Sequence, residues 1–585
     1  MAVLMGTLIG RLYYLQVIEA AKYKLLSDQN RINIRILPPQ RGLILDRAGI
    51  PMADREQTYD AVLITEKASD PNQALRILQL LIGLDEITVT RVLARRQREP
   101  SYLPISIAED LSWDTVAMIE ANAPDLPGIS IQVAERRLYR LGGTTAHILG
   151  YVAAPSEEEA ADDPLLNLPG FRVGKAGLEK QYDTMLRGTP GTSQEEVNAS
   201  GRAIRELGRH DSKPGDNLKT TIDLGLQEFT QQRLSSELSG AAVILEIASG
   251  AVLAMASVPS YSPALFDRGI SASAWRELTS DLYRPLSNKV IAGQYAPGST
   301  FKPMTALAAM TAGIGPETEV FCSGVYSLGD ARFHCWKKAG HGRLNMVQAI
   351  QHSCDIYFYE VARRAGIDAI AQTARRFGLG SATGIDLPDE HAGLIPDRTW
   401  KRATLGSPWQ QGETLVNAIG QGFVLATPLQ LAVMAARLAN GAKSVVPYFV
   451  QRAASPVTSA SGEIDPLWLN VITEGMTRVT NNPRGTAYAS RIDIPGMEMA
   501  GKSGTSQVRR ISMLERNTGI RKNEDLPWER RDHALFIAYA PVTAPKFACA
   551  VVIEHGGGGS AVAAPIARDI LVECQRGASG SEESR

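Results

Sequence analysis

The feature that most constrains the fold is the distribution of strand-like segments over the second half of the chain. Apolar segments at 241–246 and 251–256 flank a turn at Ser249-Gly250, which is the pattern of a β-hairpin. Helical patterning and then strand patterning follow, over 303–313, 345–364 and 428–440 and over 497–502, 534–540 and 547–554. Strands on both sides of a helical block predict an α+β domain with an antiparallel sheet covered by helices.

The region before this pattern is long enough to form a domain of its own. A chain of 585 residues exceeds what one hydrophobic core organises, since roughly 150 residues per domain is usual. Residues 19–215 mix strand-like runs with a helical stretch at 73–97, and the turn chemistry of residues 213–216 indicates a junction. We therefore expect a first domain over 19–215, a second over 216–575 and a disordered tail over 576–585.

Composition excludes several classes of protein. The chain is 44% apolar and 21% charged with a net charge of -1, which is typical of a globular protein and not of a disordered, fibrous or nucleic-acid-binding one. Five cysteines in this length exclude a dense disulfide scaffold, and their odd number leaves at least one thiol unpaired within a monomer.

The first eighteen residues are nearly all apolar but include Arg11. They are shorter than the roughly 20 residues of a membrane span, and they lack the basic start and cleavage site of a signal peptide. We expect residues 1–18 to be part of a transmembrane anchor with Tyr13 and Tyr14 near the water interface. The alternative is an apolar helix docked on a soluble domain.

A serine at 299 and a lysine at 302 form the one S-x-x-K sequence in the chain. If Ser299 opens a helix, the Lys302 amine lies one turn away on the same face and can reach the serine hydroxyl. A lysine that burial and nearby cations make easier to deprotonate can activate a serine as a nucleophile. An isolated S-x-x-K also fits a helix start followed by a solvated lysine.

Two further elements favour the catalytic interpretation. Ser-Cys-Asp at 353–355 lies in a predicted helical stretch, and Lys-Ser-Gly-Thr at 502–505 ends a predicted strand. With Ser299 and Lys302 they match, in order, the S-x-x-K, S-D-N and K-T-G elements of penicillin-binding proteins and class A β-lactamases. Long stretches of chain separate the three elements, so a folded cleft is needed to bring them together.

The sequence resembles the class B penicillin-binding proteins, most closely the elongation-specific transpeptidases called penicillin-binding protein 2, over nearly the whole chain. Besides the three elements, the resemblance rests on short stretches in both halves: Arg-Gly-Leu-Ile-Leu-Asp-Arg at 41–47, Gly-Leu-Glu at 177–179, Tyr-Ala-Pro-Gly-Ser at 295–299, Ile-Gly-Gln-Gly at 419–422 and Asp-His-Ala-Leu-Phe at 532–536. It implies an elongated α+β pedestal and a transpeptidase domain with a five-stranded antiparallel sheet covered by helices, as in serine β-lactamases.

The resemblance also implies roles in cross-linking peptidoglycan. Ser299 would attack the D-Ala-D-Ala carbonyl, Lys302 would take its proton, and Ser353 would relay a proton to the leaving amine. Lys502 would add positive potential, and the backbone N–H groups of Ser299 and Thr505 would form the oxyanion hole. The implied residues are, for catalysis, Ser299, Lys302, Ser353, Asp355 and Lys502, and, for substrate binding, Ser503, Gly504 and Thr505.

Position 355 departs from the asparagine that most of this superfamily has. An ionised aspartate only accepts hydrogen bonds, so Asp355 can stabilise a protonated Lys302, whereas asparagine could also donate to substrate. Aspartate here is similar to the penicillin-binding protein 2 subgroup.

Four residues of zinc-ligand type, Cys322, Cys335, His341 and Cys354, form the pattern C-x12-C-x5-H-x12-C. Zinc prefers four such ligands in tetrahedral array. The resemblance implies a zinc ligand set in this loop, with carboxylates at some positions in similar enzymes. We predict a structural zinc that fixes the segment carrying Ser353, and no cofactor for catalysis. The alternatives are a Cys322–Cys335 disulfide and ordinary buried thiols.

The resemblance implies a single-pass protein of the cell inner membrane with a periplasmic catalytic domain. No glycosyltransferase pattern precedes residue 215, so a RodA-like polymerase is expected to make the glycan, and scaffold proteins of the rod complex are further expected partners. The substrates would be peptidoglycan stem peptides on nascent, lipid-linked glycan. The alternative functions are a D,D-carboxypeptidase or β-lactamase, and a catalytically silent penicillin-binding scaffold or sensor.

Other residues have no predicted catalytic role. Cys549 is expected to be a core thiol, Cys574 carries no signal, and His533 is expected to form structural hydrogen bonds. The segment 507–531 is rich in arginine and glutamate and is expected to be a solvated loop beside the cleft, with gating of substrate entry as the alternative.

Overall fold

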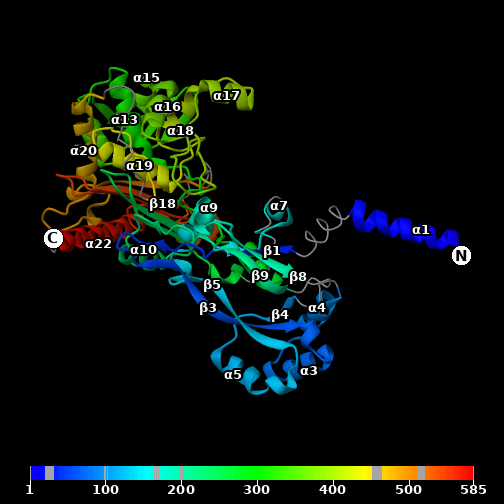
Figure 1. The fold of residues 1–585 in the computed structure, drawn as a ribbon. Coiled ribbons are helices and arrows are strands. Elements are labelled where there is room, and N and C mark those ends of the chain that lie inside the picture. Colours follow the sequence, from blue (N-terminus) through cyan, green and yellow to red (C-terminus); the bar gives the residue numbers. More distant parts are fainter. Residues whose placement is uncertain are drawn as a thin grey trace.

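In the computed structural model, a five-stranded sheet with its helices forms one part of the molecule, and an elongated second part, the pedestal, lies next to it (Figure 1). The described residues are 2–19, 32–97, 101, 103–161, 163, 165–166, 168, 170–197, 203–267, 269–450, 464–509, 515 and 521–583.

The large sheet has five strands in the order β12-β11-β19-β18-β17, and every neighbouring pair is antiparallel. The strands are β11 (Gly240–Glu246), β12 (Val252–Val258), β17 (Ala500–Ser506), β18 (His533–Ala540) and β19 (Phe547–Ile553). The predicted hairpin and the returning strands are confirmed. Every residue of β12 and β19 is buried, and this explains why their sequences are continuous apolar runs.

Helices cover both faces of this sheet. On one face α10 (Leu224–Leu234) packs against α22 (Ala563–Glu583), and on the other face lie α19 (Pro428–Ala439) and α20 (Pro466–Asn481) (Figure 1). A helical lobe beyond α19 and α20 is built from α13 (Lys302–Thr311), α14 (Met346–Gln351), α15 (Asp355–Ala365), α16 (Ile367–Arg376), α17 (Arg398–Leu405) and α18 (Gln411–Ala418).

Two predicted helix features have different outcomes. Thr427 caps α19 as predicted, because its side chain accepts a hydrogen bond from Gln430 N–H. The prediction of one helix over 345–364 is wrong, since α14 ends at Gln351 and α15 begins at Asp355. Ser353 lies between them with a φ of 52°, a left-handed conformation that interrupts an α-helix.

The pedestal contains two further sheets. One has the order β10-β2-β3-β4 with β5 also paired to β3, and the other has the order β1-β8-β9. Their strands are β1 (Ile32–Leu37), β2 (Ile44–Leu45), β3 (Pro51–Ile64), β4 (Pro104–Ala108), β5 (Ile129–Tyr139), β8 (Gly191–Val197), β9 (Ala203–His210) and β10 (Leu218–Lys219). β10 follows the predicted junction at 213–216 yet pairs with β2, so the two parts share a sheet.

The pedestal has a small core of its own at its far end. The predicted helix over 73–97 is two helices, because Gly83 ends α3 (Pro71–Ile82) with a φ of 71° and Asp85 caps α4 (Glu86–Arg96). With α5 (Trp113–Ala121) they enclose a separate apolar cluster against β3 and β4. Nearer the large sheet, pedestal residues such as Ile44 and Tyr139 belong to the same core as β11 and β19.

Short elements connect these parts. In the pedestal and before the nucleophile they are α6 (Ala146–Leu149), β6 (Val152–Ala153), α7 (Glu157–Ala160), β7 (Val173–Gly174), α8 (Gly177–Gln181), α9 (Asp183–Arg187), α11 (Ala264–Asp267) and α12 (Ala272–Ser280). Two small hairpin-like pairs precede α14, and their strands are β13 (Val320–Cys322), β14 (Val325–Leu328), β15 (Ala331–His334) and β16 (Gly342–Leu344).

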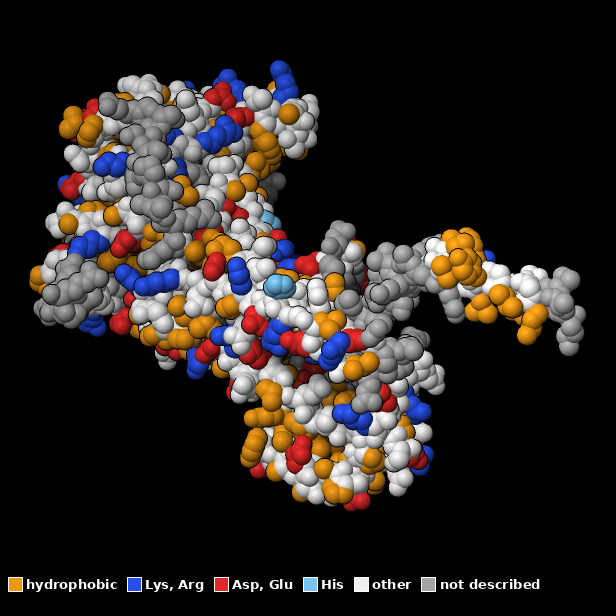
Figure 2. Space-filling view, in the orientation of Figure 1, with side chains coloured by type: hydrophobic (Ala, Val, Ile, Leu, Met, Phe, Trp, Pro, Cys, Tyr) orange, Lys and Arg blue, Asp and Glu red, His pale blue; other side chains and the backbone are white. Residues whose placement is uncertain are grey.

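The two ends of the chain are helical. α1 (Ala2–Tyr13) continues into a π-helical turn (Tyr14–Ile18), and its apolar side chains are exposed at the far right of Figure 2. Within the described residues, no helix has the length and apolar character that crossing a membrane requires. The segment 576–585, expected to be a disordered tail, instead continues α22 through Glu583, because earlier turns of α22 pack on β18 and β19 and a helix already formed extends readily.

Candidate active site and thiol cluster

The predicted nucleophile lies on a short turn that leads into α13. Ser299 is in a 3₁₀ turn (Gly298–Phe301) and Lys302 is the first residue of α13, so Ser299 precedes the α-helix and does not open it. Gly298 has a φ of 54°, and a β-carbon there would lie 2.6 Å from Thr505 O. Glycine is therefore needed for this turn to approach β17.

Two other contacts fix the nucleophile turn. A β-carbon on Gly504 would lie 2.8 Å from Pro297 O, so the backbones of β17 and the turn meet closely here as well. Gly298 N–H donates a hydrogen bond to Gly420 O at 2.8 Å. The turn that carries Ser299, the strand segment 502–505 and the loop 419–422 therefore contact one another through their backbones.

Lys302 binds the second of the three sequence elements, Ser-Cys-Asp at 353–355. Its Nζ donates hydrogen bonds to Asp355 Oδ1 at 2.7 Å, to Ser353 O at 2.8 Å and to Ser353 Oγ at 3.1 Å. The lysine side chain is fully buried, and Nζ lies 5.5 Å from the centroid of the Phe358 ring. The expected hydrogen bond between Lys302 and the Ser299 hydroxyl is not among the contacts of the described residues.

Ser353 is held at the break between α14 and α15. Its φ of 52° is rare for a residue with a β-carbon, and such strain is common at catalytic positions. Its Oγ accepts a hydrogen bond from Lys502 Nζ at 2.9 Å in addition to the one from Lys302. The Ser353 hydroxyl therefore lies between two lysines.

The third element lies inside β17 and not at its end. Lys502 is fully buried, and burial lowers its pKa well below the usual value, an effect that the charge of Lys302 increases. Ser503 Oγ is 3.2 Å from Thr486 Oγ1, and the Thr505 side chain is exposed. Lys502 of this strand segment thus binds Ser353, while Thr505 remains accessible to solvent.

The electrostatics of the site are unbalanced. Among the described residues, Asp355 is the one carboxylate hydrogen-bonded to either lysine; it binds Lys302, and its side chain is only 11% exposed. Excess buried positive charge favours loss of a proton from one amine. The site can therefore keep a neutral amine beside a serine hydroxyl, which acyl transfer to serine requires.

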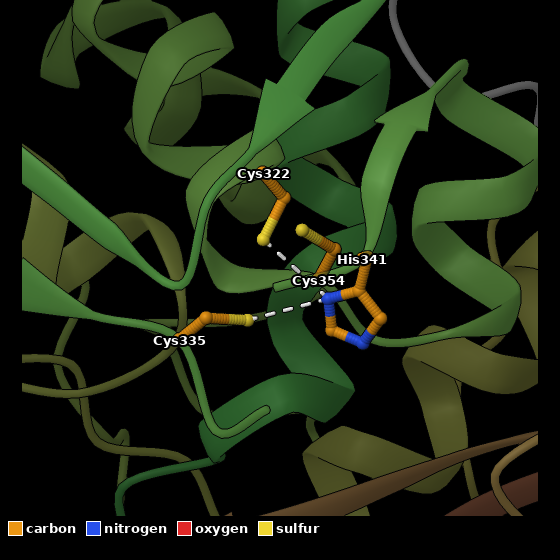
Figure 3. A group of neighbouring side chains, drawn as sticks. All are labelled: Cys322, Cys335, His341 and Cys354. Carbon is orange, nitrogen blue, oxygen red and sulfur yellow. Dashed lines mark hydrogen bonds between the residues drawn. The ribbon is translucent and has the colours of Figure 1, made fainter. Parts of the chain in front are cut away.

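The four predicted zinc ligands come together beside the second element (Figure 3). Their ligand atoms all lie within 4.8 Å of one another, and His341 Nδ1 is 3.6 Å from Cys322 Sγ and 3.5 Å from Cys335 Sγ. Tetrahedral zinc with bonds of about 2.3 Å to sulfur and 2.0 Å to nitrogen places such atoms about 3.5 Å apart. Cys322, Cys335, His341 and Cys354 therefore fit a zinc ion.

The protonation chemistry of this thiol cluster also suits zinc. Hydrogen bonding with Cys354 lowers the pKa of Cys335 to about 3 and that of Cys322 to about 6, and raises the pKa of Cys354 itself. Burial lowers the pKa of His341, but its hydrogen bonds with Cys335 and Cys322 outweigh burial and raise it. Zinc binds thiolates, so readily ionised cysteines favour it. The cysteines are free, so the alternative Cys322–Cys335 disulfide is not formed.

Family comparisons agree with this geometry. Residues 240–572 match the family described as the penicillin binding protein transpeptidase domain, and residues 36–220 match the penicillin-binding protein dimerisation domain. The chain is a class B penicillin-binding protein. The resemblance inferred from short motifs is thereby confirmed, and both parts of the family architecture are present.

Relatives in this family are similar over nearly their full length. The peptidoglycan D,D-transpeptidase MrdA of Haemophilus influenzae is 36% identical, with 97% of this chain and 89% of the relative covered. The protein of the same name in Escherichia coli K12 is 34% identical, with 96% and 90% covered. The Escherichia coli transpeptidase FtsI is 27% identical over 96% of this chain and 87% of the relative. Identity is thus higher to the two MrdA relatives.

Solved structures of penicillin-binding protein 2 share the fold. The Helicobacter pylori protein in complex with MreC has a TM-score of 0.83 and 29% identity, covering 93% of this chain and 99% of that one. The Pseudomonas aeruginosa protein in complex with WCK 5153 has a TM-score of 0.67 and 32% identity, covering 92% and 96%. The predicted fold class, a pedestal followed by a transpeptidase domain, is confirmed.

Sequence reasoning missed two residues that the structure brings to the site. Gln421 Nε2 donates a hydrogen bond to Thr505 O at 3.0 Å, and Trp336 N–H donates one to Asp355 Oδ2 at 3.0 Å. Gln421 lies in a stretch that carried the family resemblance, so that stretch was its signal. The one sequence signal for Trp336 was its place directly after Cys335.

The remaining predictions concern residues outside the catalytic contacts. His533 Nδ1 accepts a hydrogen bond from His555 N–H at 2.9 Å, and burial lowers its pKa to about 4. Cys549 is a buried core thiol in β19, and Cys574 is buried in α22. Of the predicted loop 507–531, residues 510–514 and 516–520 lie outside the described part of the chain.

Proposed function

We propose that the chain is a peptidoglycan D,D-transpeptidase that cross-links stem peptides during cell elongation through an acyl-enzyme on Ser299. One observation carries the proposal: in a class B penicillin-binding protein, the turn of Ser299 is packed against β17, and Lys302, Ser353 and Lys502 form one hydrogen-bonded cluster beside it. The two MrdA relatives at 34% and 36% identity carry this activity in their names.

The geometry supports a two-step acyl transfer. Ser299 Oγ attacks the D-Ala-D-Ala amide carbonyl, the C–O bond forms, the C–N bond breaks and D-alanine leaves with a proton. Lys302 accepts the serine proton, and Ser353 Oγ, at 3.1 Å and 2.9 Å from the two lysine Nζ atoms, relays a proton to the leaving amine. An acceptor amine then attacks the ester and restores the free serine.

Charge that develops on the carbonyl oxygen needs donors already in place. The backbone N–H groups of Ser299 and Thr505 would supply the oxyanion hole, and each such donor is worth about 2.7–4 kcal/mol of transition-state stabilisation. Ser503 and Thr505 would bind the terminal carboxylate of the donor peptide beside Lys502, with Gly504 allowing the close approach of the nucleophile turn.

Covalent labelling tests the acyl-enzyme. The full chain is incubated with a fluorescent penicillin and the modified peptide is mapped by mass spectrometry; we expect one label on Ser299. Ser299→Ala should lose the label completely, while the control Ser273→Ala on exposed α12 should keep it. Absence of label on folded wild-type protein would reject the proposal in favour of a silent scaffold.

The fate of the acyl group separates the alternatives. With a stem-peptide donor and an excess of acceptor amine, a transpeptidase forms the cross-linked peptide faster than the hydrolysed one. A carboxypeptidase or β-lactamase would pass the acyl group to water even when amine is present, and that result would reject cross-linking.

Localisation and partners are proposed by analogy with the family. We propose a single-pass inner-membrane protein with an anchor in residues 1–18, a pedestal over 19–215 and a periplasmic transpeptidase domain over 216–575. One relative is described in complex with MreC, and another neighbour belongs to a peptidoglycan synthase complex (TM-score 0.71). A RodA-like polymerase and rod-complex scaffold proteins are the proposed partners, and co-purification of the full chain with a RodA-like protein from membranes tests this.

We propose that the thiol cluster binds one structural zinc through Cys322, Cys335, His341 and Cys354. The metal would supply a fixed crosslink between the hairpins before α14 and the turn that carries Ser353. Metal analysis of the purified chain should give one zinc per molecule, and Cys335→Ser should lose it while Cys549→Ser retains it. Wild-type protein without stoichiometric zinc would remove the proposal.

A further inference from the structure

Trp336 contacts the same two groups that hold Lys302. Its backbone N–H donates to Asp355 Oδ2 at 3.0 Å, and its indole Nε1–H donates to Ser353 O and to His352 O, each at 3.1 Å. Lys302 Nζ donates to the other oxygen of the same carboxylate and to the same Ser353 carbonyl. One residue of the loop before α14 therefore shares both acceptor groups with the catalytic lysine.

These hydrogen bonds hold Ser353 in an unfavourable backbone conformation. Ser353 has a φ of 52°, and a non-glycine residue in this region costs about 1–3 kcal/mol unless its surroundings hold it there. The indole N–H binds the carbonyls of His352 and Ser353, which lie on the two sides of this φ–ψ pair. The bond to Asp355 Oδ2 fixes the rotation of the carboxylate, so that Oδ1 faces Lys302.

Burial does not explain the position of Trp336. The residue is 59% exposed, which is unusual for the largest apolar residue, so burial of the ring is not what fixes it and its directional hydrogen bonds contribute to its position. The ring lies 5.3 Å from the ring of His341, and that ring stacks on His352 at 5.9 Å. The indole thus lies against the second element and not in the core.

We propose that Trp336 is a positioning residue for acylation. It holds the 353–355 turn so that Ser353 Oγ stays between Lys302 and Lys502 and Asp355 stays against Lys302. This inference rests on the proposed acyl-serine function and adds to it a residue outside the three sequence elements. Small displacements of catalytic groups lower the rate of the chemical step more than the affinity for the ligand.

Stopped-flow acylation of the full chain with a fluorescent penicillin tests the role, because it separates the acylation rate constant from the dissociation constant of the initial complex. In Trp336→Phe, which keeps an aromatic ring and the backbone N–H but loses the indole N–H, we expect the acylation rate constant to fall about tenfold with an unchanged dissociation constant. Trp275→Phe on α12, a tryptophan that is also exposed, should change neither.

A second replacement protects the test against a simple folding defect. Substituting the Trp336 indole with 3-benzothienyl-alanine keeps the bicyclic shape and removes only the N–H donor, so it should give the same loss of rate with an unchanged thermal midpoint. Wild-type rates in this variant would overturn the inference. A change confined to the dissociation constant would also overturn it, because that would mean contact with the ligand. If wild-type protein is not labelled at Ser299, the proposed function fails first.

Discussion

Two buried charge clusters, one in the pedestal and one in the active site, follow opposite designs. In the pedestal cluster, Arg41 Nε donates to Glu179 Oε2 at 2.7 Å and Arg137 Nε donates to Glu179 Oε1 at 2.6 Å. Arg41 Nη1 also donates to Asp183 Oδ1 at 2.8 Å. Arg187 binds Asp183 as well and also binds Asp163, so three guanidinium groups face three carboxylates. Burial lowers the pKa of Arg41, but the carboxylates of Glu179 and Asp183 outweigh it and raise the pKa.

The lysines of the active-site cluster are more deeply buried than Arg41 and Asp183, and their charges are not balanced. Lys302 and Lys502 are both fully buried, and among the described residues Asp355, which binds Lys302, is the one carboxylate hydrogen-bonded to either lysine. The extra positive charge lowers the pKa of Lys502, which burial has already lowered. A balanced buried cluster specifies a structure, whereas an unbalanced one reduces stability and yields an amine that can accept a proton.

The strongest test of this difference between the two clusters is to remove one lysine from the active site. Lys302→Met should lower the rate of acylation by a penicillin about 10²–10⁴-fold, because the proton acceptor is lost. Its free energy of unfolding should fall by less than about 3 kcal/mol, because Asp355 loses its ion-pair partner but keeps the Trp336 N–H donor, and the repulsion between the two lysines is removed. Denaturant unfolding and stopped-flow acylation measure the two. A stability loss above about 3 kcal/mol would show that this cluster is structural as well.

The corresponding change in the pedestal should have the opposite result. Glu179→Gln leaves two buried guanidinium groups with one carboxylate fewer, so we expect a loss of about 3–5 kcal/mol in the free energy of unfolding. Acylation by the folded fraction should not change. The control Glu135→Gln, at an exposed position of β5, should stay within about 0.5 kcal/mol of wild type. Equal effects of the two variants would contradict the special role of Glu179.

The pH dependence of stability tests whether the pKa of Lys502 is lowered in the folded protein. The folded-state pKa of Lys502 is below the usual lysine value of 10.5, so between these two values the unfolded chain binds more protons than the folded one. Stability should therefore rise with pH in this window, by at most about 1.4 kcal/mol per pH unit. Lys502→Met should remove this rise, while Lys338→Met at an exposed position should keep it. Parallel curves for wild type and Lys502→Met in the pH range directly below 10.5 would refute the lowered pKa.

The smallest expected effect concerns the contact between the two regions. Tyr182 OH donates to Asp386 Oδ2 at 2.8 Å, and Asp386 also accepts hydrogen bonds from the N–H groups of Phe449 and Val450 at 2.7 Å and 2.9 Å. Tyr182→Phe should cost about 1 kcal/mol of unfolding free energy with no change in acylation, because Asp386 keeps its backbone donors. A measurable change in acylation rate would show that the pedestal influences the active site through this contact.

Much of the fold and the site could be predicted from sequence because the signals are local. The apolar runs at 251–256 and 547–554 predict strands, and the structure has β12 and β19 there, with every residue buried. The spacing of Ser299 and Lys302, and the order of the three elements, depend on residue identity alone. The four residues of zinc-ligand type could likewise be identified in the sequence, and the structure brings Cys322, Cys335, His341 and Cys354 together.

Side-chain identity and hydrophobic periodicity are properties of the chain. The chemical groups present and the segments that form strands and helices could therefore be predicted from sequence alone. Only the tertiary structure decided where the helix breaks and what surrounds the lysines. Nothing at 345–364 but a short run of polar residues marks the left-handed turn at Ser353, because Lys302, Lys502 and Trp336, all distant in sequence, supply the hydrogen bonds that hold it. A conformation that is unfavourable locally is stable here because long-range contacts compensate its cost.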